Sequence, residues 1–160
     1  MLHAKTMTPR SPIAGSELAT AALLGALSGV RSMLGPAVVS HALGAEHRKR
    51  LQRTTTVLAV AELLADKLPF VPARTAWLPF FGRMANAGLS AYFATRGDTR
   101  TRYAAAAVGA LSAGVSTRLS YEVRHFASTR LGVSNTVAGV VEDLGALAIA
   151  KFASSRVKAR

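Results

Sequence analysis

Cysteine is absent from the 160 residues of this chain, and acidic residues are scarce. The lack of cysteine excludes disulfides, thiolate metal ligands and cysteine nucleophiles. Only 8 Asp and Glu face 20 Lys and Arg, so the formal net charge is +12. Such a basic excess is typical of proteins that bind nucleic acid or anionic lipid, and of the cytoplasmic loops of membrane proteins. Its distribution along the chain decides among them.

Recognisable catalytic motifs are missing as well. The sequence has no phosphate-binding loop, dinucleotide-binding glycine motif or zinc-protease motif, and no serine stands in a nucleophile elbow. His41 and His125 have no metal-ligating neighbour at a useful spacing. We therefore expect no metal and no cofactor, and a non-enzymatic role is favoured. An intramembrane enzyme that acts on lipid through Glu142, Asp143 and Arg118 is an alternative that no motif supports.

Long runs of apolar residues are also lacking, but shorter apolar stretches are frequent. Five stretches that are rich in Ala, Leu and small residues, without sustained alternation, predict helices. They cover residues 17–44, 54–69, 76–95, 103–127 and 133–153. Residues 18–30 and 104–117 carry no charge on any face, whereas a surface helix of a soluble protein keeps a polar face. We expect an all-α polytopic membrane bundle. A soluble helical bundle is the alternative, because no stretch is a clean run of about 20 apolar residues.

Charge between the stretches predicts the domain order and the topology. We expect a polar tail at 1–16, one membrane domain at 17–153 and a basic tail at 154–160. Basic residues gather in the first and third connections and at the C-terminus, which the positive-inside rule places in the cytoplasm. Five crossings then put the N-terminus outside a bacterial cytoplasmic membrane and the C-terminus inside. The basic loop 47–53 is expected to contact anionic lipid. Nucleic acid is not an expected partner, because no aromatic residues are interleaved with these charges.

The chain contains an internal repeat. Residues 25–30 read GALSGV and residues 109–115 read GALSAGV, which is the same six residues with one insertion. Downstream, TVLAVAELLAD at 56–66 aligns with TVAGVVEDLGA at 136–146, and Glu62 falls on Glu142. Chance similarity between Ala- and Gly-rich helices is the alternative.

The repeat predicts two related halves, 17–69 and 103–153, joined by segment 76–95. Three crossings separate the starts of the two halves, so the halves would have inverted topology. Many transporters build a site near the bilayer midplane with this arrangement.

Three segments resemble a known family. They are GALSGVRSMLGPAVVS at 25–40, AELLADKLPFVPART at 61–75 and VED at 141–143. Together they look like a small bacterial membrane family, domain-of-unknown-function family 4126, over about residues 17–150. The resemblance implies an integral membrane protein. It implies no reaction and no functional residues.

Ionisable residues inside the predicted spans are the candidate functional groups. Each costs about 2.5–3.5 kcal/mol on insertion scales, so such groups persist when they are paired or line a wet path. Pairing that fixes the register of the helices and a cation or proton path through Glu62 and Glu142 both fit the pattern. The predicted path residues are Glu62, Asp66, Glu142, Asp143, Arg31 and Arg118, and Arg83 lies in a predicted span as well.

Small residues mark the second kind of candidate position. Gly25 and Gly29 form a small-xxx-small pair that Ala110 and Gly114 echo. This pattern predicts close helix packing within one chain or in a homodimer, with a backbone opening that exposes carbonyls to a substrate as the alternative. Predicted packing and break positions are Gly25, Gly29, Gly35, Pro36, Gly109 and Gly114.

Two helix breaks are predicted at matching places in the halves. Gly35 and Pro36 would interrupt the first segment, and the inserted Ala113 would interrupt the fourth. Broken helices at matching positions indicate a transporter site, although a kink without function fits equally. We therefore predict a small channel or transporter for an ion or small solute. The alternative is a non-catalytic membrane scaffold or a lipid- or partner-binding protein.

Overall fold

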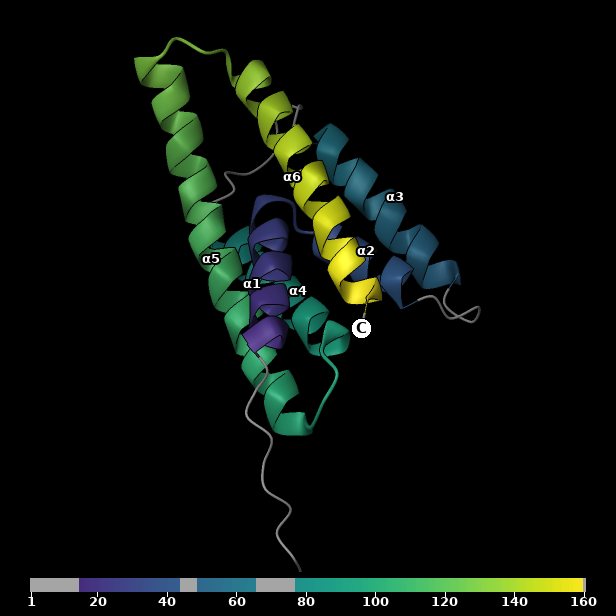
Figure 1. Ribbon diagram of the computed structural model, residues 1–160. Coiled ribbons are helices and arrows are strands. Elements are labelled where there is room, and N and C mark those ends of the chain that lie inside the picture. The colour runs from purple at the N-terminus through teal and green to yellow at the C-terminus, as the bar shows by residue number, and fades with distance from the viewer. Residues whose placement is uncertain (1–14, 44–48, 66–76, 160) are drawn as a thin grey trace, which may run out of the picture.

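The computed structural model describes residues 15–43, 49–65 and 77–159 and is all-α over these ranges (Figure 1). The helices are α1 (Gly15–Val30), α2 (Leu34–Ala42), α3 (Lys49–Ala65), α4 (Trp77–Ala94), α5 (Thr99–Arg130) and α6 (Asn135–Lys158). The five predicted stretches are therefore confirmed as helical in their described parts, but the first contains two helices. Helix α6 continues to Lys158 and so includes most of the predicted basic tail at 154–160. The predicted tail at 1–16 lies almost wholly outside the described residues.

Capping residues in the sequence determine where α5 and α6 begin. Asp98 precedes α5 in an extended conformation, and its carboxylate accepts a hydrogen bond from the Thr101 N–H. Ser134 plays the same part for α6 through the Val137 N–H. Between the two helices Gly132 has φ +66°, a left-handed backbone conformation that glycine adopts more readily than other residues. The chain reverses direction at this residue, so α5 and α6 form a hairpin. These capping bonds satisfy amides that would otherwise lack a partner within their helices.

The first predicted segment reverses direction at residues 31–33, between α1 and α2. The predicted break at Gly35 and Pro36 is therefore wrong by a few residues, since both lie inside the first turn of α2. Proline is tolerated there because an amide in the first turn has no acceptor within its helix. The second predicted break is absent, since α5 runs without interruption through Ala113.

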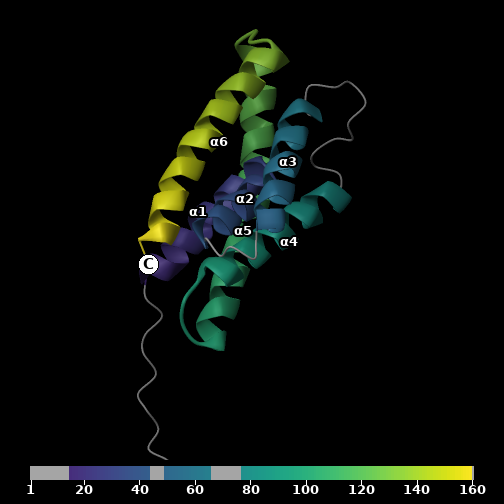
Figure 2. The ribbon, with the colours of Figure 1, turned by 90° about the vertical axis from the view of Figure 1, so that its right-hand side faces the viewer.

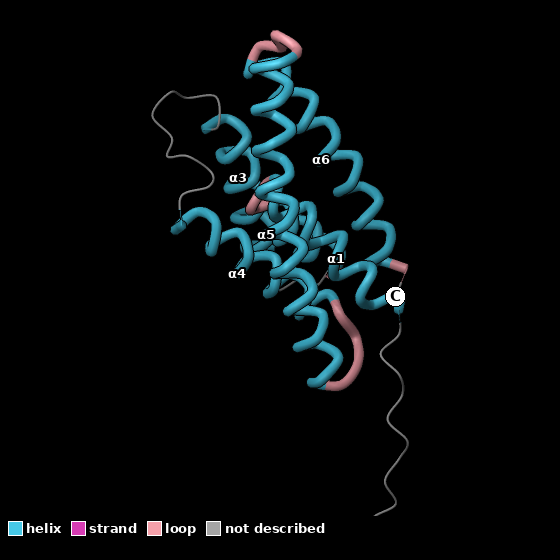
Figure 3. Tube along the Cα trace, turned by 90° about the vertical axis from the view of Figure 1, so that its left-hand side faces the viewer, coloured by secondary structure: helices cyan, strands magenta, loops and turns pink. Residues whose placement is uncertain are grey.

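Helix α1 lies at the centre of the molecule and packs against α2, α4, α5 and α6. In Figures 1 and 2, α1 begins at the same end as the last turn of α6 and the turn from α4 to α5. The hairpin between α5 and α6 lies at the opposite end, and Figure 3 shows the same arrangement from the other side. We call the end that holds the start of α1 and the last turn of α6 the lower end, as drawn in Figure 1.

The two halves of the repeat are not inverted copies of each other. Gly25 packs on Gly109 and Gly29 packs on Ala113, so the matched parts of α1 and α5 run parallel. The other matched helices, α3 and α6, run in opposite directions in Figure 1. The reason is the turn at residues 31–33, which adds a reversal to the first half that the uninterrupted α5 does not have. The predicted inverted topology is therefore wrong.

Side chains are sorted by size in an unusual way. The buried positions hold mainly Ala, Gly, Ser, Thr and two arginines, and Leu24 and Leu27 are the largest apolar side chains that are fully buried. Large apolar side chains lie outside, with Val115 on α5 68% exposed and Val141 on α6 64% exposed. Soluble proteins bury most such residues. Within the described ranges, no helix has both the length and the mean hydropathy required of a membrane span.

Candidate functional site: a buried ion-pair cluster

The turn between α1 and α2 is held by a carboxylate from α3. The amides of Ser32 and Met33 donate to Glu62 Oε1 and Oε2 at 2.9 Å and 3.0 Å. These amides are at the start of α2, where the helix dipole also favours a negative group. On its other side Glu62 Oε1 lies 3.5 Å from Nη2 of Arg83 on α4, whose side chain is 7% exposed. One carboxylate thus joins α3, the turn and α4.

The first residue of the same turn is also held by a carboxylate. Arg31 is 1% exposed, and its Nε donates to Asp143 Oδ1 on α6 at 2.8 Å. Its Nη2 binds the same oxygen. A guanidinium buried this deeply requires a charged partner, because its transfer from water is otherwise too costly. The pair therefore fixes the turn against α6.

The third pair joins α5 to α6. Glu142 accepts a hydrogen bond from Ser120 Oγ at 2.6 Å and binds Arg124 Nη2 through its other oxygen. Arg118, one of the predicted path residues, is exposed on α5, and Arg124 is the arginine that lies beside Glu142.

The three pairs follow one another across the bundle. Glu62 binds the amides of residues 32 and 33, next to Arg31, and Arg31 binds the neighbour of Glu142. We call Arg31, Glu62, Arg83, Arg124, Glu142 and Asp143 the ion-pair cluster. It contains three cations and three anions, so its formal charge is zero. The structure brings together Glu62, Glu142, Asp143 and Arg31, which were predicted as path residues, with Arg83, which lay in a predicted span. Their predicted role in an ion or substrate path stays a prediction. Asp66, also predicted, lies outside the described residues.

Three of the predicted packing glycines, Gly25, Gly29 and Gly109, lie where α1 crosses α5. Gly114 instead faces Phe80 and Met84 of α4, and Gly35 of α2 packs on Ser28 of α1. A Cβ on Gly25 would overlap the Gly109 carbonyl oxygen, and one on Gly109 would lie 2.8 Å from the Ala91 Cβ. The contact is reinforced by Ser112 Oγ, which donates to the Ala22 carbonyl at 2.7 Å, and by Thr117 Oγ1, which donates to the Gly29 carbonyl at 2.9 Å. Of the predicted alternatives, packing within one chain is the one that these contacts support. A homodimer would need a different surface.

Two of the grooves on the outside of the described bundle each lie between three helices. One, of about 630 Å³, runs between α1, α5 and α6, and its lining is apolar apart from Ser116, Ser120, Arg124 and Glu142. The other, of about 440 Å³, lies between α2, α3 and α4 and includes Asn86. The larger groove therefore gives access to one side of the ion-pair cluster.

The candidate residues predicted from the sequence did not include Arg124, although it lies near the end of the predicted helical stretch 103–127. What could have identified Arg124 from the sequence is its position relative to the turn between α5 and α6. Arg124 and Glu142 lie nine residues before and after Val133, so a hairpin that turns at this point brings them together. The capping of the turn by Glu62 has no comparable signal, since it joins residues about 30 positions apart.

Comparison of the chain with family models, with curated proteins and with solved structures finds no match. The resemblance to domain-of-unknown-function family 4126 therefore stays a prediction.

Proposed function

We propose that this chain is a multi-pass membrane protein with a non-catalytic role, a scaffold that lipid surrounds and that internal ion pairs hold together. The observation that carries the proposal is the sorting of side chains. Small, hydroxylated and charged residues lie inside, and large apolar residues such as Leu111, Val115 and Leu144 lie outside. In lipid no hydrophobic force drives large residues inward, so close packing of small residues and polar contacts hold helices together. In water the same surface would promote aggregation.

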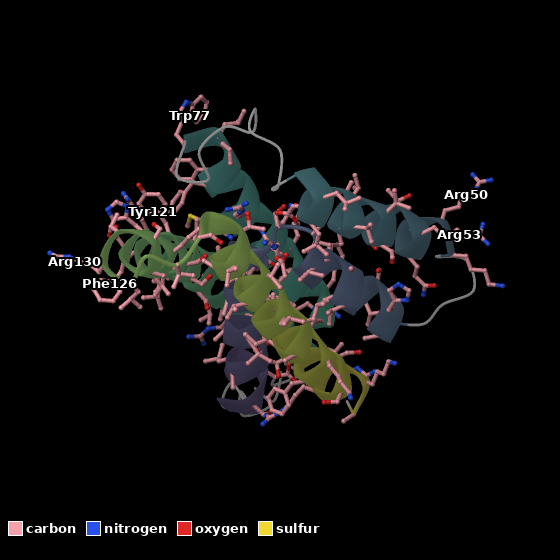
Figure 4. The ribbon with its side chains drawn as sticks, turned by 90° about the horizontal axis from the view of Figure 1, so that it is seen from above. Arg50, Arg53, Trp77, Tyr121, Phe126 and Arg130 are labelled. Atoms are coloured by element: carbon pink, nitrogen blue, oxygen red, sulfur yellow. The ribbon has the colours of Figure 1, made fainter. Side chains whose placement is uncertain are left out.

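Exposed aromatic side chains fit the same proposal. Figure 4 shows Trp77, Tyr121 and Phe126 pointing away from the bundle. Their exposed fractions are 72%, 42% and 55%. Tryptophan and tyrosine, here Trp77 and Tyr121, are enriched where a membrane meets water. Each helix has an apolar outer face and an inner face of small and charged residues. The mean hydropathy of a helix is taken over both faces, whereas in the proposed arrangement only the outer face would contact lipid.

The ion-pair cluster favours a scaffold over a channel. Each of its carboxylates binds an arginine, and Glu62 also binds two amides. A carboxylate so engaged must lose these bonds before it can bind a passing cation. The matched breaks and the inverted halves that indicated transport are absent from the described helices. Transport remains the rival proposal because the larger groove reaches Arg124 and Glu142.

Anionic lipid is the proposed partner at the start of α3. Lys49, Arg50 and Arg53 are exposed there, and Figure 4 shows Arg50 and Arg53 pointing outward. A groove of about 420 Å³ beside them is lined by residues that include His41, Lys49 and Arg53. Each basic residue near an anionic membrane surface contributes about 1 kcal/mol of attraction. Residues 47 and 48 of the predicted basic loop lie outside the described residues.

A combined fractionation and flux experiment tests the proposal. The protein should stay in the membrane pellet after alkaline carbonate extraction and should dissolve only with detergent. Liposomes that contain it should be no more permeable to protons, sodium or potassium than empty ones. Glu62→Gln and Glu142→Gln should lower the unfolding midpoint in detergent, whereas Glu122→Gln, at an exposed position of α5, should leave it unchanged.

Two results would count against the proposal in different ways. Recovery of folded protein from the cytosol without detergent would remove the membrane assignment. Ion flux that Glu62→Gln or Glu142→Gln abolishes, at unchanged protein abundance and unfolding midpoint, would replace the scaffold with a channel or transporter.

A further inference from the structure

The pair of helices α1 and α2 forms a hairpin that returns to the end from which it starts. In Figure 1, α1 rises from the lower end and α2 descends toward it. With a rise of about 1.5 Å per residue, α1 is about 24 Å long and α2 about 14 Å long. A crossing helix has about 17–25 residues, so α2 with 9 residues is far too short and α1 with 16 falls just below this range, whereas α3 has 17 residues and α4 has 18.

The turn of this hairpin has the chemistry that non-helical backbone needs at membrane depth. Irregular backbone is tolerated there only where protein buries it and satisfies its polar groups. The amides of Ser32 and Met33 are satisfied by Glu62, and the Arg31 side chain is satisfied by Asp143. Both carboxylates come from other helices, α3 and α6. The costly ionisable groups in these helices thus have a structural purpose, which is to hold the turn.

Charge is distributed unequally between the two ends of the molecule. Within the described ranges, the lower end carries nine basic residues and only Glu17 and Asp98 as acids. The nine lie at the starts of α3 and α5, before α5, and in the last two turns of α6: Lys49, Arg50, Arg53, Arg96, Arg100, Arg102, Lys151, Arg156 and Lys158. The opposite end has Arg130 and the paired Arg124. The positive-inside rule assigns the more basic end to the cytoplasm.

We infer that α1 and α2 form a re-entrant hairpin, that α3 to α6 make four crossings, and that both termini lie on the cytoplasmic side. This inference rests on the proposed membrane location. It replaces the five crossings and the external N-terminus expected from the sequence. Moving the start of the chain to the cytoplasmic side also moves Lys5 and Arg10 there, which increases the charge asymmetry between the two sides.

Single cysteines test the inference directly, because the chain has none of its own. We would place them in full-length protein at Gly15, Thr99 and Ala159, at the lower end, and at Ser128, near the hairpin between α5 and α6. The fifth is at Trp77, the first residue of α4, which the inference puts on the same side of the membrane as Ser128. All five positions are exposed, and a Cβ at Gly15 meets no atom within 4 Å. Each variant would be treated with a membrane-impermeant thiol reagent in intact cells and in opened cells. Labelling in denaturing detergent provides the reference for full reaction.

Cysteines at Trp77 and Ser128 are expected to react in intact cells, and those at Gly15, Thr99 and Ala159 only after opening. Reaction of the Gly15 and Ala159 variants from opposite sides would establish an odd number of crossings and overturn the inference while leaving the membrane location intact. The same grouping with the sides exchanged would overturn the assignment of the basic end to the cytoplasm. Recovery of all five variants in the soluble fraction would instead overturn the proposed function, and the inference with it.

Discussion

At the scale of single residues, the fold depends on a few ionised side chains whose partners are far away in the sequence. Arg31 and Asp143 are 112 positions apart and bind each other in the centre of the bundle. Removing one partner leaves the other charge buried without compensation, which is the costly way to break such a pair. Removing both eliminates the uncompensated charge.

A double-mutant cycle on this pair should show strong coupling. Arg31→Met and Asp143→Leu should each lower the free energy of unfolding by about 3–5 kcal/mol. The double variant should lose much less than the sum of the two. Chemical unfolding in mild detergent, followed by circular dichroism, measures all four proteins. Additive losses would mean that the two side chains do not interact in the folded protein.

Asp98 is a residue for which the structure predicts a pH dependence. The Thr101 hydroxyl, and then the Thr101 N–H, hold the pKa of the Asp98 carboxyl below its usual range. A group with a lowered pKa in the folded state stabilises the protein above its unfolded pKa. That contribution is lost as the pH falls through the folded pKa.

Wild-type protein should therefore lose stability between about pH 4 and lower pH in part through Asp98. Asp98→Asn should lose less over the same interval. Unfolding midpoints of both proteins in detergent at a series of acidic pH values provide the comparison. Identical pH dependence in the two proteins would exclude an interaction between the Asp98 carboxylate and the start of α5.

At the scale of helices, close contact between α1 and α5 is the main packing feature. Gly25, Gly29 and Gly109 allow the two backbones to meet, and hydroxyl groups of α5 donate to carbonyls of α1. The small-xxx-small pattern in the sequence predicted close packing at Gly25 and Gly29, within one chain or in a homodimer, without indicating α5 as the partner. It could not predict that the helices run parallel, because that depends on the turn at residues 31–33, which in turn depends on Glu62.

Adding a methyl group at this contact should be destabilising, and a matched glycine on α6 provides the control. Gly25→Ala should cost about 1–3 kcal/mol, because the new Cβ overlaps the Gly109 carbonyl and the helices must separate. Gly145 lies in α6, and a Cβ at this position would have no neighbouring atom within 4 Å. Gly145→Ala should therefore be neutral or stabilise by up to about 1 kcal/mol through helix propensity. Equal effects of the two substitutions on the unfolding free energy would contradict the close contact.

Helix positions were predictable from composition, whereas the pairing of charges was predictable only in part. Ala- and Leu-rich stretches identified the helical regions because apolar length and the lack of alternation are local properties. Which arginine binds which carboxylate depends on how the helices face one another. The sequence prediction therefore named Arg118 beside Glu142 and left out Arg124, which the register of the hairpin places there in the structure.

At the scale of the whole molecule, the central feature is an inverted distribution of side chains. A cluster of formal charge zero and a core of small residues occupy the inside, and large apolar side chains cover much of the outside. This arrangement is stable where lipid surrounds the bundle and costly where water does. In the proposed membrane orientation, the basic lower end lies at the cytoplasmic surface.

The most direct test of a lipid-facing outer surface is labelling by an apolar photoactivated carbene reagent dissolved in the membranes of intact cells. We expect the label to attach to exposed apolar positions of α5 and α6, such as Leu111, Val115 and Leu144, and the buried Leu24 and Leu27 to be protected. Absence of label from these exposed positions, with protein present and folded, would contradict the claim that this surface faces lipid.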